Sequence, residues 1–65
     1  MVTILFTKAN GLIVKSCFIE SSMNFQIILE YPNGSEIVIE TIKNITALVE
    51  THDKWVKFFL NAKIA

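Results

Sequence analysis

Hydrophobic and polar residues alternate with a period of two over the first two thirds of the chain. The alternation is interrupted at Asn10-Gly11, between Glu20 and Asn24, and at Pro32-Asn33-Gly34. Successive side chains of a β-strand point to opposite faces of a sheet, so this pattern indicates strands with one buried face. We therefore predict four consecutive strands, at about residues 2–8, 12–20, 24–31 and 35–41.

The strongest turn signal lies between the third and fourth predicted strands. An Asn-Gly pair favours a two-residue type I′ turn, which would make Pro32 and Ser35 the closing pair of the hairpin. A closing residue normally donates its backbone N–H, and proline has none. We therefore predict a three-residue loop, with Pro32 and Asn33 in a type I turn and Gly34 in the left-handed conformation.

This loop length determines which side chains share a face of the sheet. It pairs Leu29 with Ile37 and Ile27 with Ile39, so that apolar residues meet apolar residues. A shift by one residue would put glutamates beside Ile27 and Leu29, because a slip of one position turns a whole strand over.

We treat the first Asn-Gly pair in the same way. A three-residue loop there pairs Phe6 with Val14 and Ile4 with Ser16. Between the two hairpins, a two-residue or a four-residue loop places Phe18 opposite Phe25. All four strands then present one apolar face: Val2, Ile4, Phe6, Leu12, Val14, Phe18, Phe25, Ile27, Leu29, Tyr31, Ile37 and Ile39.

From about residue 45 to residue 61 the period changes to three and four. This spacing predicts an amphipathic helix, with Asn44 as its N-cap. The expected outer face carries Glu50, Asp53, Lys54 and Lys57, which form two i, i+4 pairs in the favourable order. The predicted inner stripe is Ile45, Leu48, Val49, His52, Trp55, Val56, Phe59 and Leu60.

Together these elements predict an α+β fold. We expect a four-stranded antiparallel β-meander with one C-terminal α-helix packed on one face (ββββα), forming a single domain over residues 1–65. A 65-residue chain buries only about 60% of the surface that its unfolded form exposes, so its stability alone is marginal.

Composition narrows the ways in which such a small domain can gain stability. The single cysteine excludes an internal disulfide, and one cysteine with one histidine does not supply a structural zinc site. We expect no cofactor and no metal. The chain is 52% hydrophobic with a mean hydropathy of +0.50, so we expect a protein partner to cover part of its apolar surface.

Charge and segment patterns exclude other classes of protein. The net charge is zero and there is no arginine, which disfavours nucleic-acid binding. No signal peptide or membrane-spanning run is recognisable, and a lone thiol suits a reducing cytosol, so we expect a cytoplasmic protein and no membrane partner. Frequent isoleucine, asparagine and lysine suggest AT-rich coding, as in a low-GC bacterium, a phage or a mobile element.

Three residues could carry chemistry. His52 falls on the apolar stripe of the helix, and we interpret it as a neutral core histidine bonded to a hydroxyl or carbonyl group. The alternative is a small hydrolase-like enzyme using His52 with Ser16, which lacks a carboxylate to orient the histidine. Cys17 should point to the opposite face of the sheet and behave as a small hydrophobic residue. We assign no catalytic residue.

Two carboxylates and one lysine should meet on the outer face of the sheet. Glu30 lies opposite Glu36 in the predicted register, where like charges repel each other. Lys15 on the neighbouring strand is placed to relieve that repulsion. Two surface glutamates without loop ligands are a weak metal signal, and we interpret this cluster as a solvated ion group.

The outer face is more apolar than a water-facing antiparallel sheet should be. We predict an interaction surface there, and we expect the chain to be a small non-enzymatic protein-binding module. It would form a homodimer through the uncharged edge of the first strand or through the outer face, and it would occlude or scaffold a protein partner, as a phage or mobile-element regulator or inhibitor does. The predicted surface residues are Leu5, Ile13, Ile19, Ile28, Val38 and Phe58.

Overall fold

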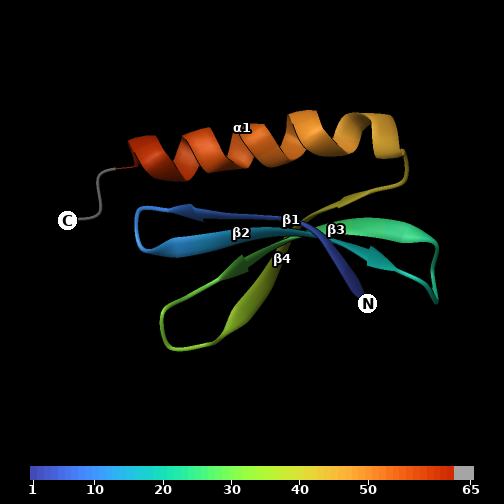
Figure 1. Cartoon of the computed structure of the whole chain (residues 1–65), viewed down its shortest axis with the longest axis horizontal. Helices are drawn as coiled ribbons and strands as arrows, with labels where there is room; N and C mark the ends of the chain where they lie inside the picture. The colour runs from blue at the N-terminus through green and yellow to red at the C-terminus, as the bar shows by residue number, and fades with distance from the viewer. Residues whose placement is uncertain (63–65) are drawn as a thin grey trace.

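A computed structural model describes residues 1–62 of the chain; residues 63–65 of the predicted domain lie outside the described part. It contains one open antiparallel sheet with strand order β1-β2-β3-β4, followed by a helix that packs on the sheet (Figure 1). The predicted ββββα architecture is therefore confirmed. The elements are β1 (Val2–Ala9), β2 (Leu12–Ile19), β3 (Asn24–Glu30), β4 (Glu36–Ile42), the 3-10 turn η1 (Ile45–Ala47) and α1 (Leu48–Asn61).

The β3–β4 hairpin closes with the predicted three-residue loop. The Tyr31 N–H donates to the Ser35 carbonyl oxygen at 2.8 Å, and the Gly34 N–H donates to the Tyr31 carbonyl oxygen at 2.9 Å. Gly34 has a φ of 89°, a conformation that favours glycine because it has no Cβ. Leu29 pairs with Ile37, as predicted.

The β1–β2 hairpin differs from the prediction. Its loop has two residues, Asn10 and Gly11, with φ values of 57° and 81°, and Ala9 pairs with Leu12. Two positive φ angles are the mark of a type I′ turn. The physical reason is that Ala9 keeps a backbone N–H to close the hairpin, whereas Pro32 at the equivalent place in the other hairpin has none.

The shorter loop turns over the C-terminal half of β1. Thr7 now pairs with Val14 and Phe6 with Lys15, so the prediction that Phe6 faces the helix is wrong. The register shifts between Thr3 and Leu5, which leaves Ile4 as an extra residue in a bulge and pairs Leu5, not Ile4, with Ser16. Beyond the bulge, Val2 pairs with Phe18.

A second bulge alters the middle of β4. Ile28 pairs with Val38, but Ile27 pairs with Glu40 and not with the predicted Ile39. A bulge sets two residues against one and bends the strand, and edge strands often contain one. As a result, the Glu40 side chain reaches the helix side of the sheet.

Strands β2 and β3 pair in the predicted register through a four-residue loop, residues 20–23. Phe18 lies opposite Phe25, and their ring centroids are 5.2 Å apart. Stacked or tilted aromatic pairs at this distance stabilise a sheet face beyond the area that they bury.

The helix begins slightly later than predicted. The Asn44 side chain accepts a hydrogen bond from the Thr46 N–H at 3.0 Å and caps the short turn η1, which leads directly into α1 at Leu48. Of the two predicted i, i+4 pairs, Asp53 and Lys57 form an ion pair at 2.9 Å. Lys54, which was expected to pair with Glu50, instead contacts Glu40 of β4 at 3.1 Å.

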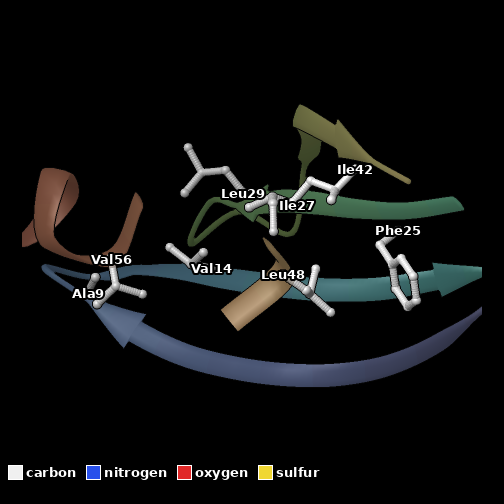
Figure 2. Close-up of a cluster of buried hydrophobic side chains, with 8 residues drawn as sticks. All are labelled: Ala9, Val14, Phe25, Ile27, Leu29, Ile42, Leu48 and Val56. Carbon is white, nitrogen blue, oxygen red and sulfur yellow. The ribbon is translucent and has the colours of Figure 1, made fainter. Parts of the chain in front are cut away.

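The core lies between α1 and the inner face of the sheet, which is the face turned toward the helix. Figure 2 shows side chains from all four strands and the helix meeting there. The helix packs mainly on β1 and β2, so Ile37 near the β3–β4 turn remains exposed although it belongs to the inner face. The buried cluster is Ala9, Val14, Phe25, Ile27, Leu29, Ile42, Leu48 and Val56.

Candidate functional site

A row of side chains crosses the outer face of the sheet, the face turned away from α1. It consists of Phe6, Lys15, Ile28 and Val38, one from each strand, and we call it the outer strip. Phe6 is 57% exposed and Val38 is 51% exposed, although both are apolar. Large apolar side chains at both ends of one row on a sheet face are a feature of contact surfaces.

The six predicted surface residues differ in the face on which they lie and in their exposure. Leu5 pairs with Ser16 on the inner face, so its assignment to the outer face is wrong, and Phe6 takes its place. Ile13 and Ile19 are half-buried on the outer face. The other three predicted residues are Ile28, which is buried on the outer face, and Val38 and Phe58, which are exposed on β4 and on α1.

Lys15, in the middle of the outer strip, forms ion pairs with two glutamates. Its ammonium group contacts the Glu30 carboxylate at 3.0 Å and also contacts Glu36, which lies opposite Glu30. To reach Glu36 on β4, the side chain of Lys15 must extend from β2 across β3. Hydrogen bonding to Glu36, and then to Glu30, raises the pKa of Lys15. The hydrogen bond from Lys15 lowers the pKa of Glu36. The predicted position of Lys15 beside both glutamates is confirmed.

The two edges of the sheet differ in charge. Strand β1 carries no charged residue from Val2 to Thr7, and several of its apolar side chains are exposed, Phe6 most of all. Strand β4 carries Glu36 and Glu40 and contains a bulge. Both edge strands contain a bulge, so their charges distinguish them. Charged side chains protect an edge against pairing with another strand, and β1 is therefore the less protected edge.

Sequence reasoning missed a second apolar surface beside β1. Val49 and Leu60 were assigned to the inner stripe of the helix, but they are 65% and 55% exposed. Val49 precedes the buried Val56 by seven residues, and Leu60 follows it by four. Residues at these spacings lie on the same side of an α-helix, so all three share one side of α1. Figure 2 shows Val56 beside Ala9 of β1, which places this side of the helix toward the free edge.

The opposite side of the helix faces β4. The Trp55 Nε1–H donates to the Glu40 carboxylate at 2.9 Å, and the Lys54 ammonium donates to the same oxygen at 3.1 Å. These hydrogen bonds, that of Trp55 first, lower the pKa of Glu40. The bulge in β4 makes this contact possible by turning Glu40 toward α1.

A buried polar cluster connects α1 to β1 and β2. The Nδ1 atom of His52 lies 2.6 Å from Ser16 Oγ, and its Nε2 atom lies 2.9 Å from Thr7 Oγ1. Both ring nitrogens therefore have a hydroxyl partner, as buried polar groups require. Burial lowers the pKa of His52, while the nearby Asp53 acts in the opposite direction.

This cluster has the contacts of a packed core. The exposed fraction of Ser16 is 0%, so solvent does not reach its hydroxyl group in this conformation. A hydroxyl from Thr7, not a carboxylate, occupies the second nitrogen of His52, where a nucleophilic triad has its orienting acid. Cys17 is buried on the other face, with its sulfur 3.7 Å from Thr3 Oγ1.

Within the described residues 1–62, no group of three or more histidine, cysteine, aspartate or glutamate side chains is arranged to hold a metal ion. No helix in that part of the chain has both the length and the apolar character needed to cross a membrane. Comparisons with models of protein families, with curated proteins and with solved structures found no match.

Proposed function

We propose that this chain is a non-enzymatic protein-binding module that works as a homodimer and docks its outer face on a protein partner. The observation that carries the proposal is the outer strip, where Phe6 and Val38 are more than half exposed at the two ends of one row. Covering such side chains contributes about 25 cal/mol for each Å² of apolar surface removed from water.

The arrangement of the outer strip supports a specific contact with a partner and not non-specific apolar association. Its centre is fixed, because the ion contacts with Glu30 and Glu36 hold Lys15 in one orientation over the buried Ile28. Partner binding would add Phe6 and Val38 as apolar anchors beside a charged group. Interfaces commonly combine a few such anchors with a polar rim.

A module of this kind would act by occlusion or by scaffolding, because the outer strip offers exposed apolar side chains for contact. The same composition that suggests AT-rich coding suits a small regulator or inhibitor from a phage or mobile element. The alternative, an enzyme that uses Ser16 and His52, stays a prediction and would require the core to open around a fully buried hydroxyl group.

The test compares two lysine substitutions on different faces of the molecule. Val38→Lys places a charge on the outer strip, whereas Asn61→Lys places the same charge at an exposed polar position of α1, away from the outer face. Tagged wild-type protein, and the Asn61→Lys variant, should capture the same discrete protein from a lysate of the source organism, and Val38→Lys should lose it. Equal capture by both variants would contradict a role for the strip.

A further inference from the structure

We propose that two copies of the chain join through the free edges of their β1 strands. The strands would pair in antiparallel register and extend the four strands of each copy into one continuous eight-stranded sheet, with both α1 helices side by side on one face. This inference rests on the proposed function and specifies the partner for the β1 edge: a second copy of the same chain.

The hairpin geometry identifies the backbone groups that are free to pair. In a two-residue hairpin the closing pair, Ala9 and Leu12, exchanges both of its backbone hydrogen bonds, and bonded pairs then alternate along the ladder. Thr7 and Val14 are thus the next bonded pair. The N–H and C=O groups of Phe6 and Lys8 consequently point away from β2, toward the open edge.

The bulge at Ile4 limits the regular part of β1 to residues 5–9. Thr7 is at the centre of this segment, so a two-fold axis through Thr7 uses its whole length. In that register Phe6 lies directly opposite the partner's Lys8, and Lys8 opposite the partner's Phe6. The only charge on the β1 strand then meets an aromatic ring and not an identical charge, which favours pairing with a second copy.

The position of the helix also fits a second copy. His52 contacts Thr7 on β1 and Ser16 on β2, so this part of α1 lies above the space between the two strands. Neighbouring strands are about 4.8 Å apart, so the helix lies about 5 Å from the two-fold axis and about 10 Å from the partner's helix. Packed helices are separated by about 8–10 Å, so the two helices would meet in contact.

The side chains on that side of the helix are suited to such a contact. Val49 and Leu60 are exposed. They lie before and after Val56 on the side of α1 that faces β1. Burial of both residues against the partner's helix would remove the largest apolar side chains from solvent on this side of α1. The β4 edge has no equivalent, because Lys54 and Trp55 already contact Glu40 there.

The dimer would also widen the surface that binds the proposed partner. Phe6 ends the outer strip at the β1 edge, so joining two edges places both Phe6 side chains near the axis and brings the two strips side by side, offset by two residues. Val38 lies at the far end of each strip, three strands from the axis. Changes at Val38 therefore separate partner binding from dimer formation.

Sedimentation equilibrium of the full chain tests the proposal with a matched pair of variants at neighbouring positions. Leu60→Lys places a charge in the helix contact, and Asn61→Lys adds the same charge at the next, exposed residue. We expect wild type and Asn61→Lys to be dimers at micromolar concentration. Leu60→Lys should raise the dissociation constant about tenfold or more, because each dimer contains two changed side chains.

A second variant tests the strand contact. Phe6→Pro removes a backbone N–H that points to the open edge, a position where an edge strand tolerates proline. It should yield a monomer whose circular dichroism spectrum matches that of the wild type. A monomeric wild type, or equal association of Leu60→Lys and Asn61→Lys, would overturn the proposal. Capture of a partner that still depends on Val38 would, in that case, leave the docking of the outer face on a protein partner standing, without the homodimer.

Discussion

The Ser16 hydroxyl and the His52 imidazole lie 2.6 Å apart inside the core, and the second nitrogen of the same ring contacts Thr7. One side chain of α1 is thus hydrogen-bonded to two neighbouring strands. These contacts place the helix above β1 and β2, and they explain why a polar residue occupies the apolar stripe of the helix.

Loss of this cluster should destabilise the fold. His52→Ala removes a buried ring and leaves the hydroxyl groups of Ser16 and Thr7 without their partner. We expect a decrease of about 2–4 kcal/mol in the free energy of unfolding, measured by urea denaturation. Asp53→Ala, at the next and exposed position, serves as the control and should change stability by less than about 0.5 kcal/mol. A similar small loss in both variants would mean that the cluster does not hold the helix.

The same histidine should make stability depend on pH. Burial lowers the pKa of His52 in the folded protein, so the unfolded chain takes up a proton at a higher pH than the folded chain does. Stability should therefore be complete above about pH 6.5 and fall as the pH decreases below that value, toward the pKa of the folded state. His52→Gln, which does not titrate there, should have a flatter profile between pH 7 and the acid limit of the carboxylates. Parallel profiles for the two proteins would contradict this assignment.

Trp55 should report the ionisation of Glu40. The indole N–H donates to the Glu40 carboxylate, and this hydrogen bond lowers the pKa of Glu40 from its ordinary value of 4.5. As the only tryptophan, Trp55 should show a change in fluorescence with a midpoint below pH 4.5 while the protein remains folded. In Glu40→Gln this transition should disappear. Its persistence in that variant would assign the titration to another group.

The outer ion cluster should show an energetic coupling. Lys15→Met removes the charge that separates Glu30 from Glu36, and it should lower the denaturation midpoint. Adding Glu36→Gln should restore part of that loss, because it removes one of the two facing negative charges. A double-mutant cycle in urea measures the coupling. Additive effects of the two substitutions would show that Lys15 does not relieve the glutamate pair.

The two hairpins show how far the fold could be predicted. Pro32 lacks an N–H, and this single fact correctly predicted the loop of the second hairpin and the pairing of Leu29 with Ile37. At the first Asn-Gly pair no proline is present, and the apolar match of Phe6 with Val14 favoured the wrong loop. The missed signal was Ala9, a small residue able to close the hairpin and to fit beneath Val56.

The bulges could not be predicted, because each depends on contacts between distant parts of the chain. Ile4 is the extra residue where β1 changes register. The bulge in β4 turns Glu40 toward the helix, where it contacts Trp55. Neither position carries a glycine or another local marker of irregular backbone. For the same reason the outer surface was predicted with Leu5 in place of Phe6, although the residues from β2, β3 and β4 were placed on their correct face.

Disulfide trapping tests the β1 edge most directly. The proposed register sets Phe6 opposite the partner's Lys8 as a hydrogen-bonded pair, with Cα atoms about 5.5 Å apart, within the range that a disulfide can bridge. Under mild oxidation, a mixture of Phe6→Cys and Lys8→Cys proteins should form a covalent heterodimer, and each variant alone should remain largely unlinked. Cross-linking of either variant to itself with equal efficiency, or no link in the mixture, would contradict antiparallel pairing of β1 about Thr7.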